Sequence, residues 1–160
     1  MSANGFTQMS VYGINLDLFS SSPIVILKVE DENRYLPIWI GQPEARSILM
    51  KLQNQEFSRP LTHDLFVSAL RELGVRIDRV VISELADETY HARLVLERGG
   101  AEVELDARPS DCVALAVRTD VKILVAEEVL EQAALGGDPG EDEAEGEGQT
   151  RPARTESGSP

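Results

Sequence analysis

An acid, a guanidinium and a hydroxyl lie close together where a predicted strand ends and a predicted helix begins. Asp106, Arg108 and Ser110 occupy this junction, and a proline suited to a first helical turn stands between the last two. Backbone N–H groups at a helix N-terminus have no partner within the helix and carry a partial positive charge. The junction therefore predicts an anion-binding site in which Arg108 and Ser110 contact a phosphate or carboxylate.

Carboxylates at several predicted helix starts are candidate ligands for a divalent cation. Glu44 and Asp111 each follow a helix-opening proline, and Asp64 lies in the first turn of another predicted helix. Together with Asp106 they would form an oxygen-rich site of the kind that Mg²⁺ or Mn²⁺ prefers. The alternative interpretation is that acids in a first turn only interact favourably with the helix dipole.

His63 is the candidate general base. It lies between Thr62, which is expected to cap a helix, and Asp64, which suits the positive end of the helix dipole. Capping explains these two neighbours but gives no reason for a histidine. We therefore expect His63 to act as a base or to position a water molecule, with Asp64 as its orienting partner or as a metal ligand. A purely structural role for His63 is the alternative.

The elements that must position these residues are strands and helices in mixed order. Residue patterns predict strands near 10–19, 23–30, 35–40, 75–85, 89–98, 101–107 and 122–125. Helices are predicted at 43–52, at 62–73, after Pro109 and at 127–134. The second helix is expected to bury an apolar stripe of Leu65, Phe66, Ala69, Leu70 and Leu73. The fold class is α+β, with a largely antiparallel sheet and about four helices.

A weak internal repeat relates two strand-to-helix junctions. The eight residues from Gln42 align with the eight from Arg108, and the two segments share a proline and a leucine. The strand pair before each junction aligns without a gap, which predicts a β-β-β-α pseudo-repeat with both junctions facing one cleft. The alternative is that any strand followed by a proline and a helix looks like this.

A two-residue turn at 99–100 sets the register of the strands on either side of it. Counting outward from the turn places Arg93 opposite Asp106. Two residues further along, His91 comes opposite Arg108, so these four side chains should form one polar cluster. The simplest interpretation is a salt bridge from Arg93 to Asp106, worth about 0–1 kcal/mol if exposed. The other face of the hairpin is apolar and carries Ala92, Leu94, Leu96, Val103, Leu105 and Ala107.

Composition divides the chain of 160 residues into one domain and a tail. From residue 136 onward the sequence is rich in glycine and glutamate and has no apolar residue larger than alanine. Such a segment has little to bury, so residues 136–160 are expected to be a disordered acidic tail after a domain at 1–135. The net charge of −13 repels nucleic acid at long range. A phosphate-binding site must therefore depend on local arginines or a metal ion.

Several classes of protein are disfavoured by the residues that are missing from the sequence. A single cysteine, Cys112, excludes an internal disulfide, and there is no zinc pattern, glycine-rich phosphate loop or Gly-x-Ser-x-Gly elbow. Aromatic residues make up only 5% of the chain, which leaves little material for stacking on bases. No signal peptide or membrane-spanning segment is recognisable, so we expect a cytoplasmic protein without membrane association.

Four motifs in the same order resemble the bifunctional nuclease (BFN, DNase/RNase) domain family. They are Leu36–Gly41 with Glu44-Ala45, then Arg59–Leu65, Asp106–Asp111 and Ala126–Leu130, and the resemblance covers roughly residues 8–134. It implies an α+β domain, cleavage of DNA and RNA, and a tendency to form homo-oligomers. It brings no assignment of nucleophile, base or metal ligands to particular residues.

The leading hypothesis is a metal-dependent nuclease acting on DNA or RNA. Arg108 and Ser110 would hold the scissile phosphate and Arg59 would contact a neighbouring one. The catalytic set is His63, Asp64, Asp106 and Asp111, and the ligands of Mg²⁺ or Mn²⁺ are Glu44, Asp64, Asp106 and Asp111. A single site requires His63, Asp64, Asp106, Arg108 and Asp111 to converge in one cleft.

Two hypotheses compete with a nuclease. In the first, the arginine-bearing junction belongs to a non-enzymatic regulatory module that binds an anionic ligand or a protein. In the second, the chain is a structural oligomerisation domain with Ile38, Trp39 and Ile40 at the interface.

Overall fold

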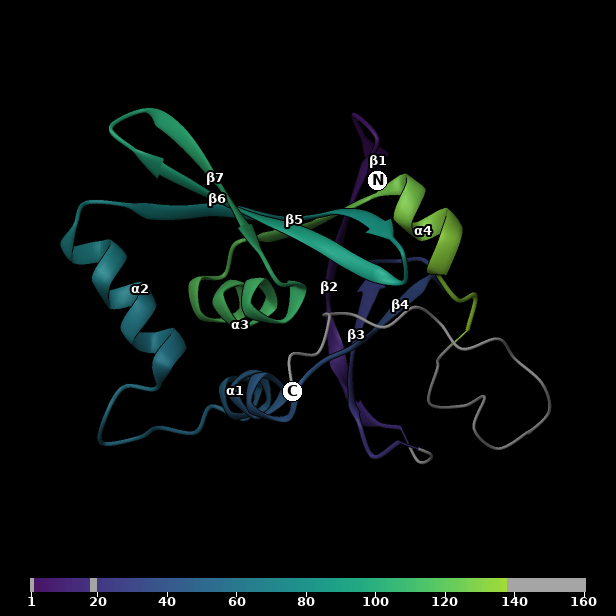
Figure 1. Cartoon of the computed structure of the whole chain (residues 1–160), viewed down its shortest axis with the longest axis horizontal. Coiled ribbons are helices and arrows are strands. Elements are labelled where there is room, and N and C mark those ends of the chain that lie inside the picture. Colours follow the sequence, from purple (N-terminus) through teal and green to yellow (C-terminus); the bar gives the residue numbers. More distant parts are fainter. Residues whose placement is uncertain (1, 18–19, 138–160) are drawn as a thin grey trace.

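The computed structural model describes residues 2–17 and 20–137 (Figure 1). Of the tail predicted at 136–160, residues 138–160 lie outside the described residues. The strands are β1 (Ser2–Ala3), β2 (Phe6–Leu16), β3 (Pro23–Val29), β4 (Tyr35–Trp39), β5 (Arg76–Ala86), β6 (Thr89–Arg98), β7 (Ala101–Ala107) and β8 (Lys122–Ala126). The helices of the described chain are α1 (Gln42–Leu52), α2 (Thr62–Glu72), α3 (Pro109–Thr119) and α4 (Glu127–Ala133). The predicted α+β class is confirmed.

One sheet holds all of these strands, in the order β4-β3-β2-β8-β5-β6-β7, with β1 paired to β2. Only β8 and β5 run parallel; the other described neighbours are antiparallel. Strand β8 therefore lies at the centre, between two three-stranded units made of β2-β3-β4 and β5-β6-β7. The sheet is largely antiparallel, as predicted.

The two three-stranded units have the connectivity expected of the pseudo-repeat. Helix α1 follows β4 and α3 follows β7, and each has a proline, Pro43 or Pro109, in its first turn. Proline suits this position because its fixed φ is helical and its missing N–H would have no partner there. Helices α1 and α3 lie side by side against the sheet (Figure 1). Helix α2 comes between the two units in the sequence and lies at one end of the domain, next to α3.

The hydrophobic core lies between the sheet and α3. Seven of the eleven residues of α3 are buried, which small side chains such as Ala114 and Ala116 allow by letting the helix approach the strands closely. Cys112 is among them, and burial raises the pKa of its thiol to about 12. It behaves as a small apolar residue. None of the helices within 2–17 and 20–137 is long and apolar enough to cross a membrane.

Helix α2 differs from the prediction because it buries none of its residues. Leu65 and Leu73 of the expected apolar stripe are 59% and 67% exposed, and Phe66 is exposed as well. Only Val67 and Leu70 pack partly against the core. The helix therefore contacts the domain only through one narrow side, and described residues leave most of its apolar face uncovered.

Polar contacts of Arg118 hold the first turn of α2 in place. The Arg118 side chain is only 5% exposed and donates from Nε to Asp64 Oδ1 at 2.8 Å. Its other nitrogens donate to the backbone carbonyls of Ala114 at 2.9 Å and Ser47 at 3.2 Å. Burying a guanidinium is costly unless its donors are paired, so Arg118 joins α1, α2 and α3 at one point.

The capping position of α2 lies one residue earlier than predicted, at Leu61 in place of Thr62. Leu61 is the residue before the first helical turn, and its N–H donates to Asp64 Oδ2 at 3.0 Å. Thr62 makes no capping hydrogen bond from its side chain. Asp64 thus performs the capping that was expected of Thr62, because Arg118 fixes its carboxylate above the end of the helix.

We predict that Arg118→Met destabilises the fold. The substitution keeps apolar volume but removes the hydrogen bonds from Arg118 to Asp64 Oδ1 and to two carbonyls, which should lower the free energy of unfolding by about 2–4 kcal/mol. Urea denaturation measures this change. The matched control is Arg71→Met on the exposed side of α2, which should stay within about 0.5 kcal/mol of the parent. Equal stability of the two variants would contradict an anchoring role for Arg118.

Candidate functional site

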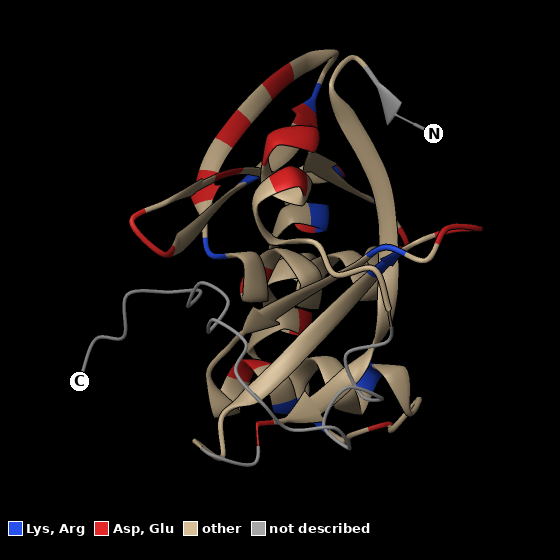
Figure 2. Cartoon of the chain, turned by 90° about the vertical axis from the view of Figure 1, so that its right-hand side faces the viewer, with Lys and Arg blue, Asp and Glu red and all other residues tan. Residues whose placement is uncertain are grey.

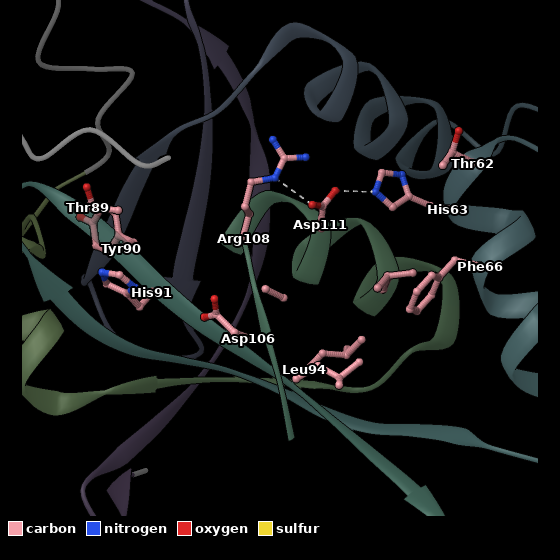
Figure 3. Close-up of a pocket in the computed structure, with 13 residues that line it drawn as sticks. Thr62, His63, Phe66, Thr89, Tyr90, His91, Leu94, Asp106, Arg108 and Asp111 are labelled. Carbon is pink, nitrogen blue, oxygen red and sulfur yellow. Dashed lines mark hydrogen bonds and ion pairs between the residues drawn. The ribbon is translucent and has the colours of Figure 1, made fainter. Parts of the chain in front are cut away.

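A chain of hydrogen bonds joins His63, Asp111, Arg108 and Glu44 across three helices (Figure 3 shows the first three). His63 Nε2 lies 2.9 Å from Asp111 Oδ1, and Arg108 Nε donates to Asp111 Oδ2 at 2.9 Å. A second nitrogen of Arg108 donates to Glu44 Oε1, also at 2.9 Å. One guanidinium therefore neutralises carboxylates from both repeat-related helices, α1 and α3.

The second ring nitrogen of His63 contacts a residue that the sequence did not single out. His63 Nδ1 lies 2.7 Å from Ser47 Oγ on α1. The hydrogen bond from His63 is the main cause that lowers the pKa of Asp111, and Arg108 lowers it further against the opposing effect of burial. Asp111 is therefore an ionised acceptor and Nε2 carries the hydrogen. In the neutral imidazole, Nδ1 is left to accept from the Ser47 hydroxyl.

The backbone of α1 places its two contributing side chains on one face. Glu44 and Ser47 are three residues apart, which is the spacing of neighbours on a helix surface. Gly41 precedes the helix, and a Cβ atom added there would meet Oε2 of Glu44. Gly41 thus leaves the space in which the Glu44 carboxylate can turn towards Arg108.

The hydrogen-bonded chain separates two pockets. The smaller, of about 710 Å³, is lined by both histidines of the chain, His63 and His91, and by Asp106. The larger, of about 1280 Å³, is lined by Glu44, Arg46 and Ser47 among others. Thr62, His63, Arg108 and Asp111 line both pockets. A ligand in either pocket would therefore contact the same polar chain.

The smaller pocket has polar groups on opposite walls (Figure 3). Asp106 and His91 come from the hairpin, whereas Arg108, Asp111 and His63 come from the helix side. The Asp106 carboxylate is exposed and makes no hydrogen bond or ion pair with another described residue. A buried Tyr90 hydroxyl, which has no partner in the described chain, belongs to the same pocket lining. These unpaired groups leave the pocket able to bind a polar ligand.

The hairpin register is confirmed, but the predicted polar cluster forms only in part. Arg93 lies opposite Asp106 in the ladder, as counted from the turn. Its side chain nevertheless pairs with Glu104 at 3.4 Å, because diagonal neighbours on a strand face are also within reach of a long side chain. The ladder ends at Ala107, so His91 and Arg108 are not paired. The prediction of a salt bridge from Arg93 to Asp106 is therefore wrong.

Three predicted site residues lie away from the two pockets. Asp64 is held by Arg118 and by the start of α2; burial opposes its ionisation, but these hydrogen bonds outweigh burial and lower its pKa. Arg59 lines a separate pocket of about 400 Å³ together with Asp64. Ser110 is fully buried and lines none of the three pockets. The single cleft expected from the sequence thus contains His63, Asp106, Arg108 and Asp111 but lacks Asp64.

The four carboxylates expected to bind a metal ion do not gather at one point. Within the described ranges, no group of three or more His, Cys, Asp or Glu side chains is arranged to hold a cation. Glu44 and Asp111 contact Arg108, and Asp64 contacts Arg118. These three carboxylates therefore already have a guanidinium where a cation would bind, and Asp106 stands apart from them, so the donor set in this arrangement does not fit Mg²⁺ or Mn²⁺.

Sequence reasoning missed two residues of the site, Ser47 and Arg118. Ser47 had one usable signal, its position three residues after Glu44 on the same helical face. Arg118 had none, since an arginine in a last helical turn is ordinary and its burial depends on the packing of three helices.

Comparison with known proteins places the chain among nuclease-related sequences. Residues 25–136 match the bifunctional nuclease domain, a region that contains all four resemblance motifs. An uncharacterized protein of Mycobacterium tuberculosis is 41% identical over 128 residues, which cover 80% of this chain and 76% of that protein.

Two plant proteins are more distant relatives. Bifunctional nuclease 1 of Oryza sativa subsp. japonica is 32% identical over 116 residues, covering 69% of this chain and 35% of the rice protein. Bifunctional nuclease 1 of Arabidopsis thaliana is 27% identical over 117 residues, covering 71% of this chain and 36% of that protein. The chain spans about a third of the length of these plant relatives.

The lowered pKa of Asp111 predicts a pH dependence of stability. At low pH the unfolded chain binds more protons than the folded one, because the pKa of Asp111 is lower in the folded state. Asp111 therefore contributes its full share to the free energy of unfolding above the ordinary aspartate pKa, and this share is lost as the pH falls through the folded-state pKa. The Asp111→Asn substitution removes the titrating carboxylate. The unfolding free energy of this variant should therefore fall less than that of the parent between about pH 6 and pH 3. Urea denaturation at both pH values measures the difference.

The matched control is Asp120→Asn at the end of α3, whose side chain makes no ion pair among the described residues. It should follow the parent over the same pH range. If Asp111→Asn does so too, the Asp111 carboxylate is not held by His63 and Arg108 in solution.

Proposed function

The chain belongs to the bifunctional nuclease domain family, and from this premise we propose that it is a nuclease that hydrolyses phosphodiester bonds of DNA or RNA. The reaction takes place beside His63, where the two pockets meet. The observation that carries the proposal is the hydrogen-bonded chain Arg108–Asp111–His63 in the shared wall of these pockets.

Each member of this chain has a role in phosphodiester chemistry. An imidazole oriented by a carboxylate is a general acid or base at neutral pH, and Asp111 fixes the ring of His63 in this way. Arg108 provides a guanidinium that is 51% exposed and can bind a phosphate through two N–H groups. Positive charge at this position stabilises the additional negative charge of the transition state.

Arg108 has to attract its substrate against the net negative charge of the whole chain. Asp and Glu outnumber Lys and Arg by 28 to 15, and Figure 2 shows acidic residues along strands and helices alike. Two carboxylates, Glu44 and Asp111, also compete directly for the guanidinium. We infer that a phosphate binds by replacing Glu44 on Arg108, so binding weakens with added salt.

The competing function is a non-enzymatic module that binds an anion or a protein in the same pockets. The acidic charge and the burial of Ser110 favour this alternative. It predicts that the chain binds its ligand and leaves phosphodiester bonds intact.

The first test is cleavage of single-stranded DNA and of RNA by the purified chain. We predict that His63→Ala lowers kcat by about 10²–10⁴-fold, the usual contribution of a general acid or base. Asp111→Asn should act in the same direction because the ring loses its orienting partner. Gel electrophoresis of end-labelled oligonucleotides measures the rates, and circular dichroism checks that each variant is folded.

The control for this test is Arg71→Ala, an exposed residue of α2 outside the three pockets, which should keep the parent rate. Cleavage that persists unchanged in His63→Ala would indicate a contaminating nuclease. Binding without cleavage by the parent chain would support the regulatory module instead.

A divalent cation, expected from the sequence, is a second and separate proposal. In the arrangement described above, Arg108 occupies the space between the Glu44 and Asp111 carboxylates. Mg²⁺ or Mn²⁺ would therefore bind there only after Arg108 has moved away. When bound, the cation would supply Lewis-acid stabilisation of the phosphate.

This second proposal has a readout that is independent of activity. Arg108→Ala releases Glu44 and Asp111 from their shared partner, so the variant should bind Mn²⁺ at least about tenfold more tightly than the parent, a difference near 1.4 kcal/mol. Titration followed by electron paramagnetic resonance measures free Mn²⁺. The control is Arg108→Ala combined with Glu44→Gln, which should lose the gain. Equal, weak binding by all three proteins would rule out a cation at these carboxylates.

Homo-oligomers and a cytoplasmic location are further proposals. Exposed apolar residues of α2 and β7 offer a surface for self-association: Leu65, Phe66, Leu73, Val103 and Leu105. The interface expected around Trp39 is less suitable, because Ile38 and Ile40 are buried in the core and the Trp39 indole donates to Asp17 at 3.1 Å. Light scattering of the purified chain and imaging of a tagged chain in cells would test the two proposals.

A further inference from the structure

The Ser47 hydroxyl is a polar group whose position the proposed roles of His63 and Asp111 leave unexplained. It lies 2.7 Å from His63 Nδ1, and His63 Nε2 lies 2.9 Å from Asp111 Oδ1. Three helices thus bring a hydroxyl, an imidazole and a carboxylate into one line of hydrogen bonds. In sequence, Ser47 precedes His63 by 16 residues and Asp111 follows it by 48.

The direction of these hydrogen bonds is set by their chemistry. An ionised carboxylate only accepts, so His63 donates from Nε2 to Asp111. The free lone pair on Nδ1 then accepts the hydrogen of the Ser47 hydroxyl. This order of hydroxyl, base and orienting carboxylate is the arrangement that activates a serine nucleophile, with the two ring nitrogens exchanged relative to the serine proteases.

Ser47 can be reached from the larger pocket. Its residue is 8% exposed and belongs to the lining of that pocket, as do Arg46 and Arg108. Arg108 contacts Glu44, which lies one helical turn before Ser47 on the same face of α1. A phosphodiester that binds Arg108 in place of Glu44 would bring its phosphorus towards the Ser47 hydroxyl.

We propose that Ser47 is the nucleophile of the nuclease, an inference that rests on the phosphodiesterase activity proposed above. Ser47 Oγ forms a bond to phosphorus while the bond from phosphorus to the leaving sugar oxygen breaks. The hydroxyl proton passes to His63 Nδ1 and from there to the leaving oxygen. The product of this step is a phosphoseryl intermediate with one shortened strand released.

Water completes the reaction. His63 takes a proton from a water molecule, whose oxygen bonds to phosphorus as the bond from Ser47 Oγ to phosphorus breaks. The proton then returns to the serine oxygen, so the second strand leaves with a terminal phosphate and the protein is restored. No co-reactant other than water is consumed.

A protein nucleophile also determines the class of substrate. Cleavage that uses the 2′-hydroxyl of the substrate is restricted to RNA, because DNA lacks that group. Ser47 would attack either backbone by the same route. The proposed nucleophile therefore gives one site that cleaves both DNA and RNA.

The test uses diisopropyl fluorophosphate, a small phosphorus electrophile that labels activated serines and releases fluoride. The full chain is incubated with the reagent and analysed by peptide mass spectrometry. We expect an adduct on Ser47 that forms at least about 100-fold more slowly in His63→Ala, since the general base is lost. Ser47→Ala should lose the adduct, whereas Ser68→Ala, an exposed serine on α2, should label like the parent.

An unlabelled Ser47, or one labelled equally fast in His63→Ala, would overturn the proposal and leave Ser47 as a residue that only positions the His63 ring. Acid-quenched reactions with an end-labelled oligonucleotide separate this result from failure of the nuclease itself. Cleavage without labelling at Ser47 would leave the nuclease standing and remove the nucleophile. Labelling that depends on His63, without cleavage of any nucleic acid, would support an activated Ser47 and reject the nuclease.

Discussion

The buried guanidinium of Arg118 is the interaction on which the arrangement of the site depends. Helix α2 buries no residue, so packing alone does little to set its position. Arg118 must pair its donors to be tolerated in the interior, and it does so with Asp64 of α2 and with carbonyls of α1 and α3. His63 directly precedes Asp64 in the sequence. The distance from His63 to Ser47 and to Asp111 is therefore set by a contact one residue away from it.

A second constraint follows from charge. Among the described residues, Arg108 provides the only guanidinium in the wall shared by the two pockets. Glu44 and Asp111 neutralise it. The acidic domain thus holds this guanidinium in an internal ion pair with two carboxylates. The Glu44 side chain is only 14% exposed, so an anion that took its place on Arg108 would leave a largely shielded carboxylate without its partner. Under the proposed function, release of the carboxylates on phosphate binding would also change the charge next to His63.

Local rules predicted the parts of the fold that depend on neighbouring residues. The turn at 99–100 gave the register of β6 and β7 correctly down to Arg93 and Asp106, because a two-residue turn leaves one way to pair the strands. The prolines at 43 and 109 gave the start of α1 to within one residue and that of α3, because the fixed φ of proline suits a first helical turn. The apolar stripe of α2 was mispredicted, since periodicity shows that a face is apolar and not that another element covers it. Asp64 was assigned to the wrong cluster because its partner, Arg118, lies 54 residues away.

The site itself arises where the internal repeat is broken. The repeat-related helices α1 and α3 supply matching groups, a carboxylate in each first turn and one guanidinium between them. Two such junctions alone would form an ion pair with no group able to transfer a proton near neutral pH. Helix α2 has no counterpart in the other unit, and it brings the only histidine that contacts both α1 and α3 in the described chain. Helix α2 therefore places an imidazole ring against the junction formed by α1 and α3, and it is held there by its polar first turn and not by a buried face.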